Sequence, residues 1–285
     1  TSDLSFIIAP KINPAGRLSD MTIGIQCLLA ENLDQASGFA KQLIKFNENR
    51  KLIESDMVLS AIEELNDQSF KISHSIVLTN DKWHQGVVGI LASRLKEKYF
   101  RPTIIFASFN DEMIKGSGRS IDSFHLRDAL DLISKRHPSL IKTFGGHAMA
   151  AGLSIKKNDF KKFSEIFELT CQEFMTPDLL NQTVEYDKSI EPENLNYPLA
   201  KMINEQVWGQ GFPAPFFVDK FVVIHQEVIG EKHLKCFLKC EKKYQAIFFN
   251  HNQKLPDKIK AVYSIDTNEF NGNKSLQIII KSIME

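Results

Sequence analysis

The sequence contains few cysteines and no long apolar run, and both absences limit the kind of protein it can encode. Its four cysteines form neither a C-x-x-C pair nor a metal-finger spacing, so no disulfide framework is predicted. This cysteine usage suits a reducing cytoplasm. The chain also lacks a signal-peptide pattern and an apolar run of the roughly twenty residues that span a membrane. We therefore expect a cytoplasmic protein with no membrane partner.

A net charge is missing as well, because 35 basic residues balance 35 acidic ones. The whole molecule is therefore no electrostatic attractor for nucleic acid. From Phe212 onward lysines slightly outnumber carboxylates, which a phosphate-binding surface and a solvated face explain equally well. The 285 residues, 43% hydrophobic and 25% charged, are typical of a globular chain long enough for two domains.

The sequence also lacks a convincing metal site. Phosphodiester hydrolysis usually needs an activated water and divalent metals held by carboxylates and histidines. Asp122, His125 and Asp128 have a tempting spacing. We interpret Asp122 as a helix cap and the other two as exposed helix positions, so no metal ligand is predicted here.

What the sequence does contain is an unusual stretch from Lys115 to Leu153. It opens with Lys-Gly-Ser-Gly-Arg-Ser, which we interpret as a glycine-spaced polar turn. Glycines let the backbone approach an anion closely, and Arg119 offers a planar fork of donors suited to a phosphate. The third glycine of a dinucleotide-binding fingerprint is absent.

The stretch ends with Gly145-Gly146-His147 followed by small residues. A glycine pair of this kind indicates a tight turn that can hold an imidazole beside a large group. For either end taken alone, an ordinary turn is the simpler interpretation. The two together, separated by an apolar-periodic segment, are much more specific.

Alternating strand and helix patterns predict a layered α/β domain over residues 70–182. Before it, a buried strand end and loop are expected at residues 5–17. A long amphipathic helical region is expected at 34–66, and its simplest interpretation is a helix pair. The strands expected within the domain are 75–79, 103–107, 113–121 and 152–155. The helices expected there begin near His84 and cover 126–136 and 160–174.

A boundary is indicated where two glycines and two prolines fall within Gly209–Pro215. Upstream lies a connector with a strand-like segment at 183–187 and a helix near 197–205. Downstream, five β-rich stretches without a convincing helix predict an all-β barrel of the OB type. These stretches are 217–225, 233–239, 244–249, 259–264 and 276–283.

The two motifs at the ends of the Lys115–Leu153 stretch resemble the DHH-associated domain of the DHH phosphoesterase superfamily, and within it the RecJ family of exonucleases. The resemblance also takes in Trp83–Ile90, Arg101-Pro102 and Ala9–Arg17, and so covers nearly the whole chain. The family's Asp-His-His triplet and Asp-x-Asp pair are absent. They belong to an N-terminal catalytic domain, and a start at Thr1 without Met is consistent with an excised fragment.

The resemblance implies five segments and a fold class. Residues 1–33 would be the end of the catalytic domain, 34–69 a helical linker and 70–182 the α/β DHH-associated domain. A connector at 183–211 would lead to an OB-like β-barrel at 212–285. The family's Gly-Asn-Pro-Glu-Pro junction is replaced by Gly211-Phe212-Pro213-Ala214-Pro215, which puts junction-specific contacts in doubt.

The resemblance also implies roles for individual residues. His147 would be catalytic, donating a hydrogen bond to the phosphate that is cleaved. Arg17 would face the nuclease cleft, although a loop arginine is usually a surface residue, and Trp83 is otherwise a core residue. The residues expected to bind DNA or phosphate are Arg17, Trp83, His84, Ser117, Gly118, Arg119, Ser120, Gly145, Gly146, Lys235, Lys239 and Lys274.

The implied function is the substrate-binding part of a single-stranded DNA exonuclease that acts 5′ to 3′ in DNA repair and recombination. Mn²⁺ or Mg²⁺ would be bound by the missing domain, so this chain alone is expected to be inactive. Single-stranded DNA is the expected partner, with a single-strand-binding protein and a helicase as candidate protein partners. The alternatives are a superfamily phosphodiesterase for short oligonucleotides or cyclic dinucleotides, and a non-catalytic replication scaffold.

Overall fold

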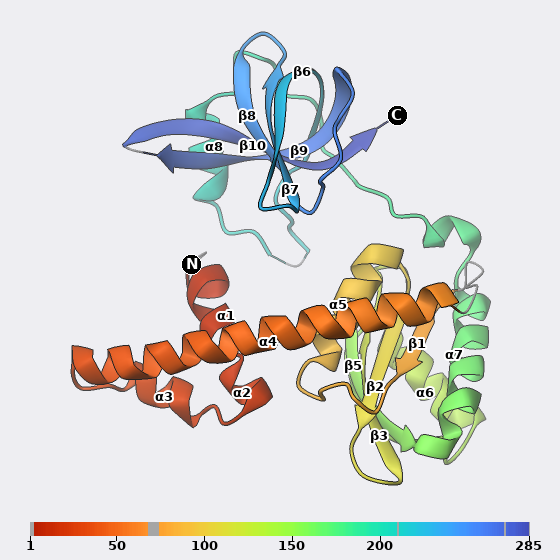
Figure 1. The fold of residues 1–285 in the computed structure, drawn as a ribbon. Helices are drawn as coiled ribbons and strands as arrows, with labels where there is room; N and C mark the ends of the chain where they lie inside the picture. Colours follow the sequence, from red (N-terminus) through yellow and green to blue (C-terminus); the bar gives the residue numbers. More distant parts are fainter. Residues whose placement is uncertain (1–2, 68–73, 210, 271, 285) are drawn as a thin grey trace. The chain divides into compact units, whose positions relative to one another are not determined.

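The computed structural model describes residues 3–67, 74–209, 211–270 and 272–284. The chain divides into two compact units, Thr1–Gln182 and Thr183–Glu285. The first contains helices and a mixed sheet, and the second contains a strand barrel (Figure 1). Among the described residues, no helix combines the length and the apolar character needed to cross a bilayer.

The N-terminal segment is helical throughout its described part. A π-helical turn at Asp3–Ile8 leads into α1 (Ala9–Ile12), α2 (Ala15–Leu18) and α3 (Thr22–Leu28). The buried strand end expected at residues 5–17 is therefore wrong. Ile7 and Ile8 are exposed rather than buried. A short apolar run does not by itself distinguish a strand from a helix, which is why the pattern misled.

The region expected to be helical after residue 34 forms one continuous helix, α4 (Leu33–Asp67), and not a helix pair. Its start is capped by Asn32, whose Oδ1 accepts the backbone N–H of Gln35 at 3.0 Å. The first half packs against α1, α2 and α3, and the second half against α5 (Val88–Tyr99). The expected linker ends, and the expected α/β domain begins, within residues 68–73, which lie outside the described part of the chain.

The sheet of the first unit is mixed. Its strand order is β1-β2-β3-β5-β4, in which β1 and β2 are parallel and the other pairs are antiparallel. The strands are β1 (Ile76–Thr79), β2 (Thr103–Ser108), β3 (Met113–Arg119), β4 (Ile141–Gly146) and β5 (Ala150–Lys156). The other helices are α6 (Leu126–Arg136), α7 (Phe160–Phe174) and the 3-10 turns Lys157–Asp159 and Pro177–Leu180.

Each face of this sheet carries its own hydrophobic core. On one face, α5 and the second half of α4 enclose side chains such as Ile76, Leu78 and Ile105. On the opposite face, α6 and α7 pack over side chains such as Ile104 and Phe106. The alternation of Ile104, Ile105 and Phe106 between the two cores is the period-two pattern of a strand buried on both sides.

Three local expectations in this unit are corrected. The Lys-Gly-Ser-Gly-Arg segment is part of strand β3, so the strand expected over 113–121 is confirmed and the turn interpretation of the same residues is wrong, because β2 and β5 pair with the segment on both sides. Gly145 and Gly146 end strand β4, which the sequence pattern had missed, and the turn follows at 147–149. Helix α5 begins at Val88, four residues after His84.

The glycines of β3 are explained by packing. A Cβ on Gly116 would lie 2.6 Å from the Phe106 ring, and one on Gly118 would lie 2.7 Å from Leu126 Cδ2. Both positions face the core beneath α6 and α7. The glycines therefore bring the strand close to that core, and they do not mark a loop.

The second unit is built on a closed barrel with strand order β10-β8-β7-β6-β9, so the expected five-stranded barrel is present. Only the β8–β10 pairing is parallel. Helix α8 (Tyr197–Asn204) packs against β9 and β10. The strands are β6 (Phe217–Ile229), β7 (His233–Lys239), β8 (Lys243–Phe248), β9 (Lys258–Phe270) and β10 (Asn273–Met284).

The segment expected as a connector belongs to the barrel unit. Ile190, Leu195 and Ala200 lie in the barrel core. The Tyr244 hydroxyl donates to the Leu195 carbonyl oxygen at 3.2 Å, which ties the segment to β8. The compact unit thus begins at Thr183, well before the expected barrel boundary at residue 212. Residues 183–187 form no strand; the neighbouring Lys188 makes one isolated bridge to Phe217.

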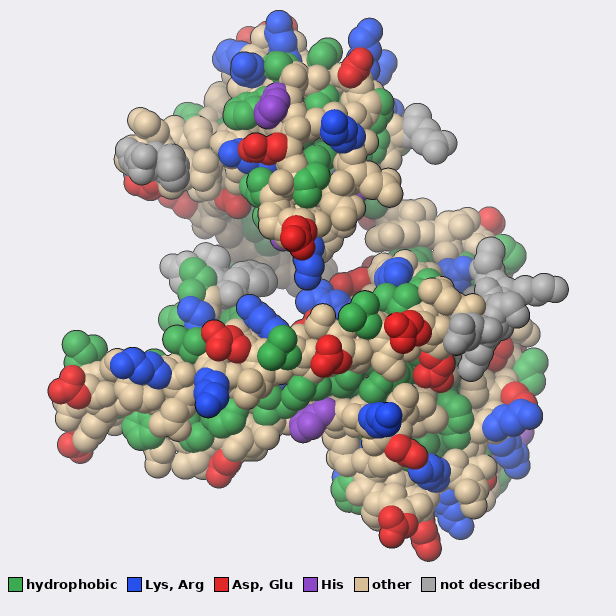
Figure 2. All heavy atoms as spheres, viewed as in Figure 1, with side chains coloured by type: hydrophobic (Ala, Val, Ile, Leu, Met, Phe, Trp, Pro, Cys, Tyr) green, Lys and Arg blue, Asp and Glu red, His purple; other side chains and the backbone are tan. Residues whose placement is uncertain are grey.

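Figure 2 shows both basic and acidic side chains on one face of the molecule. Along α4 they are interspersed up to Lys51, and from Glu54 to Asp67 the charged residues are all acidic. This mixture agrees with the zero net charge of the chain. Any anion-binding function must therefore come from local groups of basic residues.

Candidate phosphate-binding site

Arg119 occupies the end of β3, opposite Ala150 of β5. Its Nη1 donates to the Ser117 hydroxyl at 3.1 Å and to the Gly118 carbonyl oxygen at 2.8 Å. Among the described residues no carboxylate lies within ion-pair distance of this guanidinium. The side chain is also partly buried. Arg119 thus carries a partly buried positive charge that no carboxylate of the described residues neutralises.

A second arginine, Arg17, lies close enough to affect its charge. Burial lowers the pKa of Arg119 below its ordinary value, and the nearby positive charge of Arg17 lowers it further. Arg17 lies on α2 and is exposed. Two guanidinium groups that repel each other cost free energy unless an anion lies between them. The pair therefore has the charge arrangement of a phosphate site.

Two glycines of the α5 region make this arrangement possible. A Cβ on Gly89 would lie 2.9 Å from Ser117 Oγ and 3.0 Å from Arg119 Nη2. A Cβ on Gly86 would lie only 2.1 Å from the carbonyl oxygen of Arg17. The start of α5 is thus pressed against both arginine-bearing segments.

Beside Arg119 the sheet presents a floor without side chains. Ser117 pairs with Gly152, and Gly152 pairs with Gly145, so the three form one row across β3, β5 and β4. Gly152 and Gly145 are exposed, and no atom lies within 4 Å of a Cβ built on Gly145. A ligand bound at Arg119 can therefore lie flat against the backbone of these strands.

His147 stands at the end of this floor. It follows Gly146, whose φ of +144° disfavours any side chain, and its N–H bonds to the Ala150 carbonyl oxygen at 2.8 Å. Two backbone hydrogen bonds tie this β4–β5 hairpin to the segment that follows β3. The Ser120 N–H donates to the Met149 carbonyl oxygen, and the Leu126 N–H donates to the Ala148 carbonyl oxygen. The two motifs that stand about thirty residues apart in the sequence are thus hydrogen-bonded neighbours, with His147 exposed.

Several residues expected in the site have other surroundings. Ser120 is 1% exposed and donates its hydroxyl to the Phe124 carbonyl oxygen at 2.6 Å, so it is not available to a ligand. Trp83 is 6% exposed and packs in the core beneath α5, as the simpler interpretation of the sequence held. Gly118 faces the opposite core. His84 is exposed, and its Nδ1 accepts the N–H of Gly86 at 3.1 Å.

Two of the barrel lysines, Lys235 and Lys239, lie on β7, whose neighbours in the barrel are β6 and β8. Lys239 of β7 stands directly opposite Lys243 of β8, and both are exposed. Like charges opposite each other destabilise a sheet, which again favours an anionic ligand. Lys243 was not singled out in the sequence, although strand alternation after the β7–β8 turn is a signal that could have found it.

The other two barrel lysines are paired. Lys235 lies 3.5 Å from Glu227, and Lys274, at the start of β10, lies 3.8 Å from Glu269. Exposed pairs of this kind contribute little and are easily exchanged for a phosphate. The turn of which Lys274 is a part also contains Asn271, which lies outside the described residues.

The described residues do not offer a metal site. No group of three or more His, Cys, Asp or Glu side chains within residues 3–67, 74–209, 211–270 and 272–284 is arranged to hold a metal ion. His125, and not Asp122, caps α6: its Nδ1 accepts the Asp128 N–H at 3.2 Å.

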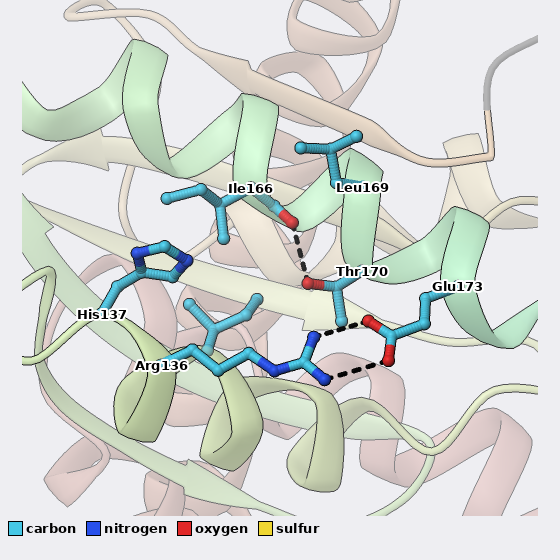
Figure 3. Close-up of a pocket in the computed structure, with 7 residues that line it drawn as sticks. Arg136, His137, Ile166, Leu169, Thr170 and Glu173 are labelled. Carbon is cyan, nitrogen blue, oxygen red and sulfur yellow. Dashed lines mark hydrogen bonds and ion pairs between the residues drawn. The ribbon is translucent and has the colours of Figure 1, made fainter.

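A hollow between α6 and α7 lies on the opposite face of the sheet from Arg119. Figure 3 shows Arg136 of α6 and Glu173 of α7 joined by two hydrogen bonds, of 2.5 and 3.0 Å, at its rim. The charges of Arg136 and Glu173 therefore neutralise each other at this rim. We interpret the Arg136–Glu173 pair as a structural contact that holds α6 against α7.

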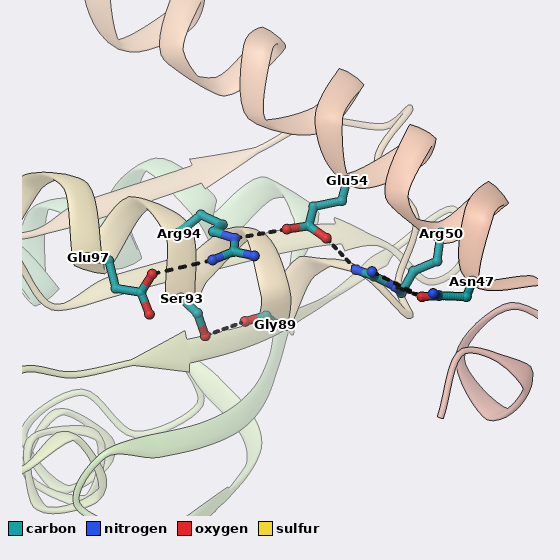
Figure 4. Close-up of polar contacts among 7 residues, drawn as sticks. All are labelled: Asn47, Arg50, Glu54, Gly89, Ser93, Arg94 and Glu97. Atoms are coloured by element: carbon teal, nitrogen blue, oxygen red, sulfur yellow. Dashed lines mark hydrogen bonds and ion pairs between the residues drawn. The ribbon is translucent and has the colours of Figure 1, made fainter. Parts of the chain in front are cut away.

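Helix α4 is tied to α5 by a charged network that the sequence did not reveal (Figure 4). Glu54 of α4 accepts a hydrogen bond from Arg94 of α5 at 2.9 Å and another from Arg50 one turn before it. Burial by itself raises the pKa of Glu54, but the bonds from Arg94 and Arg50 outweigh it, and the pKa lies below its ordinary value. This network holds α5, and with it Gly86 and Gly89, against α4.

Comparison with known proteins agrees with this architecture. The DHHA1 domain family matches residues 71–173, and the RecJ OB domain family matches residues 186–282. The chain is 40% identical over 294 residues to the single-stranded-DNA-specific exonuclease RecJ of Escherichia coli (strain K12), covering 99% of this chain and 51% of that protein. The corresponding protein of Haemophilus influenzae is also 40% identical, over 297 residues, with 99% and 52% covered.

Among solved structures, the crystal structure of RecJ from Thermus thermophilus in complex with Mn²⁺ superposes with a TM-score of 0.79. The sequences are 25% identical, and the match covers 99% of this chain and 41% of that one. The chain spans about half the length of the curated relatives it matches. It is a DHHA1 domain followed by a RecJ OB domain, and it belongs to the RecJ family.

Proposed function

We propose that this chain is the substrate-binding part of a single-stranded DNA exonuclease. The observation that carries the proposal is the Arg17–Arg119 pair. The Arg119 guanidinium lies beside Gly89 at the start of α5, and the Arg17 backbone lies against Gly86 just before it. No carboxylate among the described residues forms an ion pair with either arginine. A phosphate of a nucleic acid would satisfy both guanidiniums through charge-assisted hydrogen bonds.

The exposed floor beside Arg119 leads from this phosphate towards His147. In the proposal, Arg119, Arg17 and the Ser117 hydroxyl hold a terminal or flanking phosphate, and the strand lies over Gly152 and Gly145. His147 then donates a hydrogen bond to the phosphate being cleaved, where negative charge builds up. Arg119 and His147 differ in role: one holds the substrate and the other lowers the barrier to reaction.

The barrel would guide the rest of the strand. Lys239 and Lys243 form the unpaired basic part of its β6–β8 surface, and Lys235 adds a charge that only one exposed carboxylate balances. Phe237 lies between these lysines in the sheet, next to His225 at a ring distance of 6.4 Å. Basic residues interleaved with aromatic rings are typical of surfaces that bind single strands by backbone attraction and base stacking.

The chemical step would need groups from outside this chain. The RecJ structures of relatives contain Mn²⁺ or Mg²⁺, and a divalent metal can activate the attacking water. Since the described residues do not form a metal site, we propose that the metal is held by a catalytic domain that relatives carry in addition. A cytoplasmic location, 5′ to 3′ polarity, and partnership with a single-strand-binding protein and a helicase stay predictions.

Binding of a 5′-phosphorylated single-stranded oligonucleotide, measured by fluorescence anisotropy at several salt concentrations, tests the proposal. We expect weak binding whose affinity falls steeply with salt, because phosphate contacts release counterions. Lys235→Ala combined with Lys239→Ala should weaken binding and reduce the salt slope by about two. Replacing Lys161 and Lys162, which are exposed on α7 on the opposite face of the first unit's sheet from Arg119, is the matched control and should leave binding unchanged.

Two results would contradict the proposal. Affinity that does not depend on salt, or that is higher for duplex DNA, would favour the scaffold alternative. Degradation of the oligonucleotide by the purified chain with Mn²⁺ or Mg²⁺, abolished by a substitution within it, would show that the chain carries its own catalytic site.

A further inference from the structure

Lys115 continues the row of ligand-facing side chains on β3. Lys115, Ser117 and Arg119 alternate with the buried residues of the strand and so share the face towards α5. Successive residues on one face of a strand are about 7 Å apart. Lys115 is therefore one strand step beyond the Ser117–Arg119 phosphate site, and it is exposed.

The ammonium group of Lys115 rests on an aromatic ring. Its Nζ lies 3.4 Å from the ring centroid of Phe109, in the turn that joins β2 to β3. No ion pair links Lys115 to a carboxylate of the described residues, although Asp111 and Glu112 stand in the same turn. The ring holds the charge near the strand without neutralising it.

Phe109 itself is 49% exposed, even though an ammonium group covers part of one ring face. The remaining surface of the ring is therefore open to a planar ligand. A large apolar side chain left exposed at the tip of a hairpin contributes little to folding. It is a suitable platform for a nucleobase, since every base has a π-face.

The position of this ring is fixed from two sides. The backbone N–H of Phe109 bonds to the Met113 carbonyl oxygen at 3.0 Å, which closes the hairpin. The side-chain amide of Gln85 donates to the carbonyl oxygen of Ser108, the residue before Phe109. Gln85 precedes Gly86, which contacts Arg17, so the ring is anchored to the same loop that forms the phosphate site.

A carboxylate bonded to the residue before Phe109 is already paired with another lysine. Asp81 accepts hydrogen bonds from Lys157 at 2.7 and 2.8 Å and from the Ser108 hydroxyl at 2.6 Å. These partners hold the pKa of Asp81 below its ordinary value. Because Lys157 already neutralises the Asp81 carboxylate, the positive charge of Lys115 stays available to a ligand.

We propose that Phe109 and Lys115 form a nucleotide subsite next to the Arg119 phosphate site. Phe109 stacks on the base of the nucleotide whose phosphate Arg119 holds, and Lys115 binds the adjoining phosphate of the strand. This inference rests on the proposed function and adds to it where the base lies. The ligand class is a single-stranded nucleic acid with a phosphate at its end.

The test compares two small ligands on the chain, thymidine 5′-monophosphate and 2-deoxyribose 5-phosphate, titrated by NMR, which detects millimolar binding. The wild-type chain should bind the nucleotide about tenfold tighter than the sugar phosphate, because only the nucleotide has a base to stack. Phe109→Leu, which keeps apolar volume without a π-face, should remove that difference. Phe109→Trp should keep the difference. Arg119→Ala should lower the affinity for both ligands by a similar factor.

Lys115 is tested with a 5′-phosphorylated oligonucleotide at several salt concentrations. Lys115→Gln should reduce the salt slope of binding by about one, and Lys115→Arg should restore it. Lys98→Gln is the matched control, since Lys98 also lies over a ring, that of Tyr99 at 5.3 Å, but at the other end of α5. It should leave the slope unchanged.

The outcomes separate this inference from the proposed function. If the wild-type chain binds neither small ligand, or binds them independently of Arg119, the phosphate site is wrong and the subsite falls with it. If the sugar phosphate binds through Arg119 but Phe109→Leu leaves the tenfold difference intact, the subsite alone is wrong. An unchanged salt slope in Lys115→Gln overturns the role given to the lysine.

Discussion

Gly86 and Arg17 are in such close contact that a Cβ atom on Gly86 would lie 2.1 Å from the carbonyl oxygen of Arg17. The contact joins the loop before α5 to helix α2, and it is between backbone atoms, which cannot rotate away as a side chain can. Arg17 is thereby held beside Arg119. Under the proposed function, a glycine that itself bears no functional group thus keeps the two arginines close enough to bind one phosphate.

Gly86→Ala should destabilise the chain, since the added methyl group must displace backbone. Overpacking of this kind costs about 1–3 kcal/mol, and a thermal melt measures it. Gly38→Ala is the matched control: Gly38 lies within α4 with nothing within 4 Å of a Cβ. In an exposed helix interior, alanine is more favourable than glycine by about 1 kcal/mol. An unchanged melting temperature for Gly86→Ala would show that the contact is not maintained in solution.

Gly89→Ala should separate binding from stability. Its Cβ would meet the ends of the Ser117 and Arg119 side chains, at 2.9 and 3.0 Å. Both side chains can rotate away, so the fold should keep its melting temperature or gain from the better helix former. The displaced Arg119 should bind the oligonucleotide several-fold more weakly. Loss of stability without loss of binding would mean that Gly89 serves packing alone.

Arg119→Ala should weaken capture of a 5′-phosphorylated oligonucleotide by roughly tenfold to a hundredfold, the range expected for hydrogen bonds to a charged group. Lysine should rescue only part of the loss, because it restores the charge but not the fork. The melting temperature should not fall, since removing Arg119 also removes its burial cost and its repulsion from Arg17. A large drop in melting temperature would identify Arg119 as a structural residue.

His147→Ala should lower turnover and leave substrate binding nearly unchanged. The measurement needs an enzyme that joins this chain to a catalytic domain of its family. Loss of one donor at a site of developing charge typically costs roughly a hundredfold to a thousandfold in rate. Because His147 is exposed, the melting temperature should change little. Cleavage at the parent rate would exclude a catalytic role.

Glu54→Gln should change how stability depends on pH. Its pKa in the folded chain lies below the ordinary 4.5, so its carboxylate stabilises the fold fully at pH values above 4.5. This stabilisation is lost as the pH falls through the folded-state pKa. The substitution should cost about 1–2 kcal/mol at neutral pH and flatten the unfolding free energy against pH in the acid range. Glu97→Gln, at an exposed residue 3.6 Å from Arg94, should do neither.

The sequence by itself determined the periodic elements. Helices α6 and α7 begin and end at the expected residues, and five strands with turns between them sufficed to predict the barrel. These segments bury one continuous face, so the pattern of apolar residues is enough to specify them. The family resemblance, carried by the motifs around Arg119 and His147, also needed no structure.

The tertiary structure decided what the glycines are for and which expected site residues can meet a ligand. Lys-Gly-Ser-Gly-Arg has the composition of a turn, and the sequence pattern also predicted a strand over 113–121. The strand is formed because β2 and β5 pair with the segment, and its glycines let Phe106 and Leu126 approach. Ser120 is closed off by a bond to Phe124 that no local pattern shows. The approach of Arg17 to Arg119 joins segments that are about a hundred residues apart. Such contacts depend on how separate elements pack, and a sequence pattern records only what each element buries.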